Sequence, residues 1–415
     1  MARILLHTLV FAPDSVSTAF LMTDLARQLR GAGHEVTVLT TTPHYNLDPA
    51  ALRQQPLRSR LFGLAAESTC DGVGVWHIRI PMKGARVLTR VLDYLYFHSA
   101  AIALGLALVR KCDVVITPSP PLSMGVVGWL LGAVRGIPSV YNVQEVYPDF
   151  AVNQGIIRNR TIIGLLKRLE RFVYRRNTHI VTISDWFTRM LSARGVPAEK
   201  LSTIPNFVDT ELYRPLPRAN SFARENGLLD PFVVLYGGNV GLSQDWDSFL
   251  FAAESLSGHP ILFVVVGNGV RSAWLEQEVS RRRLGNVRLL GYQSRGRMPE
   301  INASADLCTI PMKRGTTSDT FPSKIYTIMA SGKSVLVQAD PDSELQWLVT
   351  SQGCGRVAPP EDPAAYAGAV FKAFQERDLL SQEGERGRKL VQTVYSKEAV
   401  AAQYSGLIAQ LIRSR

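Results

Sequence analysis

Two hydrophobic patterns alternate along the first half of the chain. Short runs rich in Val, Ile and Leu predict buried strands, and stretches with apolar residues every three or four positions predict amphipathic helices. The expected strands are 3–11, 34–41, 113–120, 137–143 and 178–184, and the expected helices are 17–33, 120–136 and 185–195. Strands that alternate with helices form a parallel sheet with helices on both faces. We therefore expect a doubly wound α/β domain over residues 1–205.

The alternation stops and then restarts. Three prolines and little periodicity over 201–217 predict an interdomain linker, placed at 206–220. Further strands are expected at 232–238, 261–269, 287–292, 306–312 and 334–339, with helices at 245–256, 272–283, 297–305 and 343–350. We expect a second domain over 221–395 and a C-terminal helix over 396–415 that packs back on the first. Substrates of such folds bind where the parallel strands end.

The composition is that of a globular protein. Of 415 residues, 46% are hydrophobic and 20% are charged, which excludes wholesale disorder. The four cysteines are far apart and form no Cys/His cluster, so we expect free thiols in a reducing cytoplasm. The apolar N-terminal segment is expected to be a strand and not a signal peptide, and no apolar run approaches the roughly 18–20 residues that span a bilayer.

The net charge of +11 is concentrated in the first half. Residues 1–210 hold 23 Lys and Arg against 14 Asp and Glu, whereas 211–415 hold 23 against 21. Much of the excess lies in Arg158–Asn177, where apolar residues at helical spacing alternate with arginines. Two interpretations stay open: a helix packed by its apolar stripe with a solvated basic side, or attraction to anionic lipid, worth about 1 kcal/mol per cation. Nucleic acid is not expected, because aromatic residues do not interleave with the charges in the way that a stacking platform would need.

Three junctions between a strand and a helix in the second half suit an anion. They contain Gly237, Gly238 and Gly241; then Gly267, Asn268 and Gly269; and then Pro322, Ser323 and Lys324. Glycines let backbone N–H groups approach a ligand, a helix start adds partial positive charge, and a lysine reaches a phosphate. A single such junction is more often a plain tight turn, but three in one domain favour a shared anion. No G-x-G-x-x-G motif follows the first strand, which argues against a dinucleotide-dependent oxidoreductase.

These segments resemble a known family over nearly the whole chain. "LYGGNVGLSQDWDSFLFAA", "VVVGNGV" and "FPSKIYTIMASGKSVLV" are similar to the C-terminal domain of retaining GT-B glycosyltransferases of family 4, and "YNVQEVYPDFAVNQGIIRN" is similar to their first domain. The branch that they resemble most contains bacterial O-antigen and capsule N-acetyl-fucosamine-type transferases. The resemblance implies a GT-B fold, with two Rossmann-like domains facing across a cleft.

The resemblance also implies site residues. Lys324 and Asp319 are expected to act in catalysis. The residues expected to bind the donor are Gly238, Asn239, Gly241, Gln244, Gly267, Asn268, Gly269, Tyr292, Pro322, Ser323 and Glu344. The residues expected on the acceptor side are Asp14, Ser15, Ser17, Glu145 and Asp149. For Glu145 and Asp149 an acidic helix cap and surface pair is an equally good interpretation.

The chain departs from the broader family at several positions. Asn239 and Gln244 replace a usual Arg and Lys, Val16 and Ser17 replace a glycine pair, and Gln144 replaces a histidine. Thr327 stands where the second carboxylate of the E-x7-E motif usually binds the ribose. Glu344 is expected to substitute for that carboxylate.

The expected reaction follows from the charges. Transfer from a nucleotide diphosphate releases a dianion, which N–H dipoles and Lys324 would stabilise without a metal. Asp340 and Asp342 spell D-x-D, but a turn after a strand explains them better. The expected function is transfer of a sugar of the N-acetylated deoxyhexose type from a UDP donor to a lipid-linked, lipopolysaccharide or polysaccharide acceptor, by an enzyme peripheral to the inner membrane.

Two other functions remain open on the same scaffold. A nucleotide-sugar 2-epimerase would form product without an acceptor. A non-catalytic subunit would bind UDP tightly without transfer.

Overall fold

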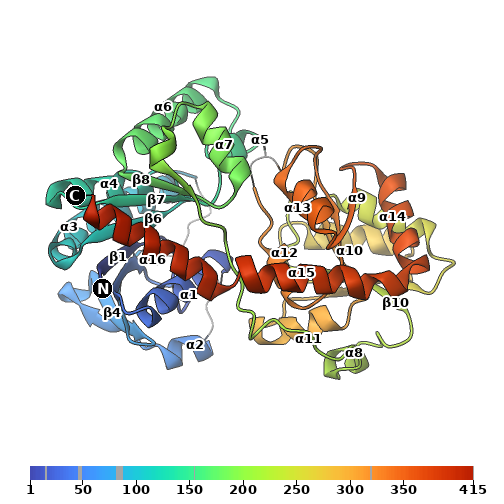
Figure 1. The fold of residues 1–415 in the computed structure, drawn as a ribbon. Helices are drawn as coiled ribbons and strands as arrows, with labels where there is room; N and C mark the ends of the chain where they lie inside the picture. Colours follow the sequence, from blue (N-terminus) through green and yellow to red (C-terminus); the bar gives the residue numbers. More distant parts are fainter. Residues whose placement is uncertain (15, 45–48, 81–86, 154, 318–319, 415) are drawn as a thin grey trace. The chain divides into compact units, whose positions relative to one another are not determined.

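A computed structural model describes residues 1–14, 16–44, 49–80, 87–153, 155–317 and 320–414. The chain forms two compact units (Figure 1). Unit 1 comprises Met1–Asp149, Ile157–Asn206 and Lys397–Arg415, and unit 2 comprises Phe150–Ile156 and Phe207–Ser396. The C-terminal residues therefore belong to unit 1, and the short stretch Phe150–Ile156 belongs to unit 2.

Unit 1 is built on a nine-stranded sheet in the order β3-β4-β5-β2-β1-β6-β7-β8-β9. The strands are β1 (Arg3–His7), β2 (Glu35–Thr41), β3 (Arg58–Arg60), β4 (Ala65–Cys70), β5 (Val73–Ile78), β6 (Val114–Pro118), β7 (Ser139–Val143), β8 (His179–Thr182) and β9 (Leu201–Thr203). The sequence predicted β1, β2, β6, β7 and β8, and these strands pair in parallel.

The expectation of an entirely parallel sheet is wrong at one edge of unit 1. Strand β4 pairs antiparallel with both β3 and β5. Asp71 and Gly72 connect β4 to β5, with φ angles of 47° and 80°. Asp-Gly with both residues at positive φ is a favoured two-residue hairpin turn, because its twist matches that of the strands. This dipeptide indicates a turn, but the weak apolar pattern of β4 did not predict the strands on either side of it.

The helices of unit 1 form two groups. They are α1 (Ser17–Gly31), α2 (Pro49–Gln54), α3 (Val87–Leu108), α4 (Met124–Arg135), α6 (Arg160–Arg176), α7 (Asp185–Ala193) and α16 (Lys397–Arg413). Helix α4 packs against α3 and α6, while α1 packs against α16 (Figure 1). The short helix α5 (Asp149–Asn153) begins in unit 1 and continues in unit 2. In the described part of the chain, no helix is both long and apolar enough to cross a membrane.

Helix α6 is the basic helix that the sequence predicted. Asn159 caps it by accepting hydrogen bonds from the N–H groups of Thr161 (2.9 Å) and Ile162 (3.2 Å). Only Glu170, Val173 and Tyr174 of this helix are buried. Ile162 and Leu165, near its N-terminus, are about half exposed. The apolar stripe is therefore covered by unit 1 only toward the end of the helix.

Unit 2 is built on a six-stranded parallel sheet in the order β12-β11-β10-β13-β14-β15. The strands are β10 (Phe232–Gly237), β11 (Ile261–Val266), β12 (Val287–Leu290), β13 (Leu307–Pro311), β14 (Val335–Gln338) and β15 (Gly355–Ala358). The helices are α8 (Ser221–Glu225), α9 (Trp246–Ser255), α10 (Ser272–Arg281), α11 (Met298–Ala303), α12 (Lys324–Ala330), α13 (Glu344–Gln352), α14 (Pro363–Gln375) and α15 (Leu380–Val394).

The central strand β10 shows how the core of unit 2 is divided. Phe232, Val234 and Tyr236 contribute to one buried cluster, which includes residues of α9 and α14. Val233 and Leu235 contribute to a second cluster, which includes residues of α12. Alternate side chains of a strand point to opposite faces, so helices cover both faces of this sheet.

The segment predicted as a linker packs into unit 2 after Asn206. Val208 and Tyr213 are buried in the unit 2 core. The Arg388 guanidinium donates to the carbonyl oxygens of Thr210 (3.1 Å) and Tyr213 (2.8 Å). The prolines prevent regular structure here, but the apolar side chains between them still bury surface.

Candidate functional site

Two glycine-rich loops interlock at the carboxyl ends of β10 and β11. The N–H of Gly238 donates to the Val266 carbonyl (2.9 Å), and the N–H of Val240 donates to the Asn268 carbonyl (3.1 Å). The N–H of Gly241 donates to the Asn239 carbonyl (3.1 Å) and to Oε1 of Gln244 (2.9 Å). These N–H groups are occupied within the protein, so the expectation that they approach a ligand needs correction.

Close contact between the two loops explains why two of their positions are occupied by glycine. A Cβ on Gly267, which has a φ of 140°, would lie 1.9 Å from the Gly238 carbonyl oxygen. A Cβ on Gly269 would lie 2.2 Å from the Val240 carbonyl oxygen. Side chains at either position would push the loops apart. The glycines therefore shape the site, while the exposed side chains of Asn239 and Asn268 remain available to a ligand.

Lys324 lies beside the first loop. Its Nζ is 3.0 Å from the position that a Cβ on Gly238 would occupy. Nζ donates a hydrogen bond to the Tyr236 hydroxyl (2.6 Å) and lies 3.8 Å from the centroid of the Tyr236 ring. Burial of the ammonium lowers the pKa of Lys324 to about 7, although part of the side chain remains exposed. The structure thus brings together the predicted loop and the predicted lysine.

Tyr236 holds this arrangement, and the sequence analysis missed it. Its hydroxyl donates to the Asn239 carbonyl (2.5 Å) while accepting from Lys324, so it joins the lysine to the loop. Its ring packs edge-on against Trp246 at 4.8 Å, and the Trp246 indole donates to the Gly241 carbonyl (3.1 Å). The tyrosine looked like a buried strand residue. Its position immediately before Gly237 and Gly238 was the only indication of a role in the site.

The loop after β13 is anchored by Asp340. Its carboxylate accepts from the N–H of Gly315 (2.8 Å) and from the hydroxyl of Thr317 (2.6 Å). Asp342, two residues later, lies in a turn at a φ of 62°. The D-x-D sequence therefore forms a turn after β14, and Asp340 links this turn to the loop after β13. Across the described ranges, no group of three or more His, Cys, Asp or Glu is arranged to hold a metal ion.

Thr327 replaces the expected carboxylate with a local contact. Its hydroxyl donates to the Lys324 carbonyl (2.8 Å), one turn back in α12. This bond stabilises the turn that carries Lys324. Asp319, the first acidic position of the same motif, lies outside the described residues, so its predicted role stays a prediction.

The other predicted donor residues occupy loops and helix starts at the carboxyl ends of the strands. Gln244 is buried, and its side chain supports the Gly241 loop through the N–H contact above. Tyr292 follows β12 and is exposed. Pro322 and Ser323 precede α12, and Glu344 is the first residue of α13 after the Ser343 cap.

On the acceptor side, the structure separates Glu145 from Asp149. Asp149 forms an ion pair with Arg194, which also pairs with Glu170 (2.6 Å), so Asp149 has a structural role. Glu145 follows β7, and burial raises the pKa of its carboxyl group to about 7. Glu145 therefore does not form an exposed surface pair with Asp149, and its role on the acceptor side stays a prediction.

Asp14 and Ser17, the other described acceptor-side residues, lie around the start of α1. Asp14 is buried and accepts the N–H of His44 (3.1 Å). Ser17 is the first residue of α1, and Ser15 lies outside the described residues.

Gln144, which replaces the family's histidine, belongs to a buried polar network in unit 1. It accepts from the Asn206 amide (2.7 Å) and donates to Asn142. Asn142 in turn donates to the Tyr404 hydroxyl in α16 (2.9 Å). The end of β7 is thereby fixed to two distant segments: Gln144 holds Asn206, and Asn142 holds Tyr404.

Comparison with known proteins identifies both halves of the chain. Residues 20–206 match the model of the glycosyl transferase 4-like domain, and residues 218–390 match that of the glycosyl transferases group 1. The chain is 25% identical to the putative colanic acid biosynthesis glycosyl transferase WcaI of Escherichia coli K12, over 97% of this chain and 98% of that protein. It is 26% identical to the probable glycosyltransferase WbjE of Pseudomonas aeruginosa, over 73% and 76%.

Solved structures share the fold. HepE of Anabaena, crystallised with UDP and glucose, superposes with a TM-score of 0.75 at 15% identity, over 99% of this chain and 100% of that chain. This similarity assigns the GT-B fold.

Proposed function

Since the chain belongs to the group 1 glycosyltransferases, we propose that it is a retaining enzyme that moves a sugar from a UDP donor to a lipid-linked or polysaccharide acceptor. The observation that carries this proposal is the contact of Lys324 with Tyr236 beside Gly238. This contact concentrates one positive charge next to the loop at the end of β10. A sugar of the N-acetylated deoxyhexose type is the proposed donor sugar, from the resemblance of the "GGNVG" and "FPSK" segments.

In the proposed reaction, an acceptor hydroxyl oxygen forms a bond to the anomeric carbon as the bond to the β-phosphate oxygen breaks. UDP leaves with the bonding electrons, and the acceptor proton passes to the departing phosphate. Lys324 stabilises the charge that develops on this phosphate, and it does so strongly because its ammonium is largely shielded from water. Glu145 is proposed to position the acceptor. No metal ion is required in this scheme.

The acceptor partner is proposed from unit 1. Helix α6 carries exposed Ile162 and Leu165 together with exposed cations such as Arg168 and Arg171. Such a helix binds anionic lipid by combining apolar contact with charge attraction. We expect the enzyme to lie at the cytoplasmic face of the inner membrane, and its similarity to WcaI, a putative colanic acid biosynthesis glycosyl transferase, suits a role in polysaccharide synthesis.

The test of the catalytic role is Lys324→Ala. Loss of a preorganised charge at the leaving group should lower kcat by about 100-fold. The fold should survive, because the variant also removes a poorly solvated ammonium group. Lys372→Ala is the matched control, because Lys372 is an exposed lysine of α14. Near-normal turnover by Lys324→Ala, measured by UDP release, would remove the leaving-group role.

A further inference from the structure

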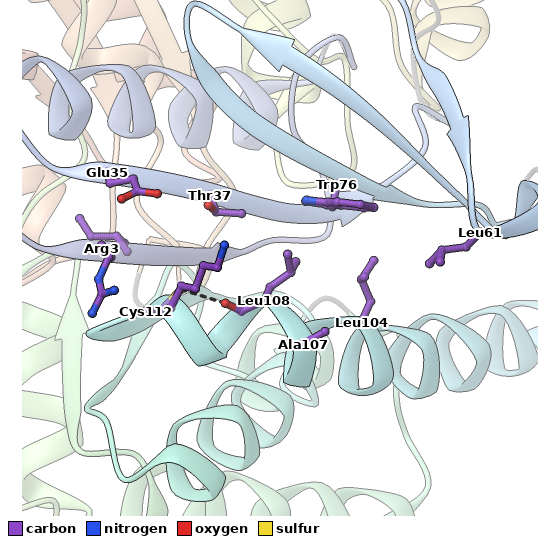
Figure 2. Close-up of a pocket in the computed structure, with 11 residues that line it drawn as sticks. Arg3, Glu35, Thr37, Leu61, Trp76, Leu104, Ala107, Leu108 and Cys112 are labelled. Atoms are coloured by element: carbon purple, nitrogen blue, oxygen red, sulfur yellow. Dashed lines mark hydrogen bonds between the residues drawn. The ribbon is translucent and has the colours of Figure 1, made fainter.

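A cavity of about 540 Å³ lies in unit 1 where β1 and β2 begin. The strands end at the opposite edge of the sheet, where Glu145 lies, so this cavity is separate from the proposed acceptor site. Figure 2 shows it as a slot between α3 on one side and the strands β1, β2 and β5 on the other. Leu61, Trp76, Leu104 and Leu108 form its apolar walls. Lys111 contributes a cation and Glu35 a carboxylate to its lining, and the lining Arg3 pairs with Asp113 at 2.8 Å.

An apolar turn projects beside this slot. It consists of Leu61, Phe62 and Leu64, which are 53%, 108% and 62% exposed. Leu61 and Phe62 have φ angles of 47° and 53°, in the left-handed region that bulky residues rarely adopt. The chain thus holds an unfavourable backbone conformation that leaves an aromatic ring entirely in water. Within the described part of the chain, neither the left-handed backbone nor the exposed ring buries apolar surface.

A second apolar surface adjoins the turn. From Tyr94 to Val109 the chain has no charged residue. Leu92, Leu95 and Tyr96 are exposed, and Ala103 and Ala107 continue the same stripe of α3. At 1.5 Å per residue this α3 stripe is about 22 Å long. Ala107 lines the same slot as Leu61, so the stripe and the apolar turn form one surface.

The charges around the apolar turn are predominantly basic. Arg58 and Arg60 immediately precede the turn and are exposed. The Arg79 guanidinium lies 3.9 Å from the Cβ position of Gly63, inside the turn. Glu67 pairs with Arg60 at 3.0 Å. Lys111 lies at the far end of the α3 stripe.

We propose that the apolar turn and the α3 stripe insert into the headgroup region of an anionic bilayer, with the slot receiving part of an acyl chain. The arginines around the turn would contact lipid phosphates, since cations near an anionic surface add to the apolar attraction. The choice of a lipid partner rests on the proposed lipid-linked acceptor. The surface itself rests on the exposure of Phe62, the uncharged face of α3 and the basic rim.

A bilayer fits this surface better than a protein partner does. Protein interfaces combine an apolar centre with a polar rim of mixed charge. Here three arginines surround the turn and a single glutamate pairs with one of them. A fully exposed phenylalanine on a short turn is also the kind of residue that buries its ring at a lipid interface.

The test is co-sedimentation of the full chain with vesicles, either of phosphatidylcholine alone or mixed with phosphatidylglycerol. Phe62→Asn removes the ring, and asparagine tolerates positive φ, so folding should be preserved. We expect this variant to bind mixed vesicles about tenfold more weakly than the unchanged chain. Phe251→Asn is the matched control, because Phe251 is an exposed phenylalanine of α9 in unit 2, and it should bind like the unchanged chain.

Each outcome decides the proposal. Equal binding by Phe62→Asn and the unchanged chain would overturn it. A change in molar mass in solution, without an effect on vesicle binding, would instead assign the turn to a protein contact. Circular dichroism checks that both variants are folded. The vesicle assay does not depend on sugar transfer. A chain without transferase activity can still bind vesicles, so failure of the membrane proposal and failure of the proposed function are distinguishable.

Discussion

Lys324 and Tyr236 form the most informative pair of residues in the protein. The lysine could be predicted from the sequence, because a cation at a helix start after a loop suits a phosphate. The tyrosine could not be predicted, because its hydroxyl bonds depend on where two separate loops meet in space. The bond from Lys324 to Tyr236 is charge-assisted, and such bonds contribute about 1.5–3 kcal/mol.

Tyr236→Phe tests this positioning role. The ring remains to pack on Trp246, but the bonds to Lys324 and to the Asn239 carbonyl are lost. We expect kcat/KM for the donor to fall about tenfold. Tyr366→Phe is the matched control, because Tyr366 is an equally buried tyrosine whose hydroxyl contacts Thr309 (2.8 Å) away from the site. Equal losses in both variants would mean that Tyr236 is only structural.

Donor binding should be linked to proton uptake at Lys324. A pKa of about 7 means that the lysine is mostly neutral at pH 8 in the free protein. A bound diphosphate favours the charged form and raises that pKa, so binding at pH 8 should take up nearly one proton. At pH 6 the lysine is already charged in the free protein, so binding should be accompanied by little proton uptake.

Calorimetry with UDP at pH 8, in two buffers of different ionisation enthalpy, measures this uptake. Lys324→Met, which cannot take up the proton, is the comparison. The same uptake in both proteins would contradict the assignment to Lys324.

At the scale of elements, the strands and helices with strong periodicity were predictable, and the edge hairpin was not. β4 is rich in small and polar residues, so its apolar pattern is weak, and only Asp71-Gly72 indicated the turn. The glycine loops lie at the strand ends where they were predicted, and their binding of a donor stays a prediction. Their glycines allow one loop to pack against the other, and a sequence alone does not show that contact.

Gly267→Ala tests the loop packing. The added Cβ would lie 1.9 Å from the Gly238 carbonyl oxygen, on a residue at a φ of 140°. We expect a loss of about 2–4 kcal/mol in the free energy of unfolding, together with weaker UDP binding. Denaturant titration gives the first quantity and calorimetry the second. Gly285→Ala serves as the control, since a Cβ at Gly285 would meet no atom within 4 Å; a similar loss there would argue against specific loop packing.

At the scale of the whole molecule, two α/β units could be predicted from the repeated strand–helix alternation. The placement of residues 150–156 in unit 2 was not predicted, whereas the C-terminal helix was expected to return to the first domain, and residues 397–415 belong to unit 1. These exchanges depend on contacts between distant parts of the chain. The predicted donor residues that the structure describes lie in unit 2, and the described acceptor-side residues lie in unit 1.

The central claim is that this chain transfers a sugar from a nucleotide diphosphate. Mass spectrometry of reactions with UDP-, GDP- and TDP-linked sugars, with and without a polyprenyl-linked saccharide, tests it most directly. We expect that a UDP sugar gives UDP and a glycosylated lipid, and that this product requires the acceptor. No transfer from any donor in the presence of the acceptor, or conversion of the donor sugar without an acceptor, would contradict it.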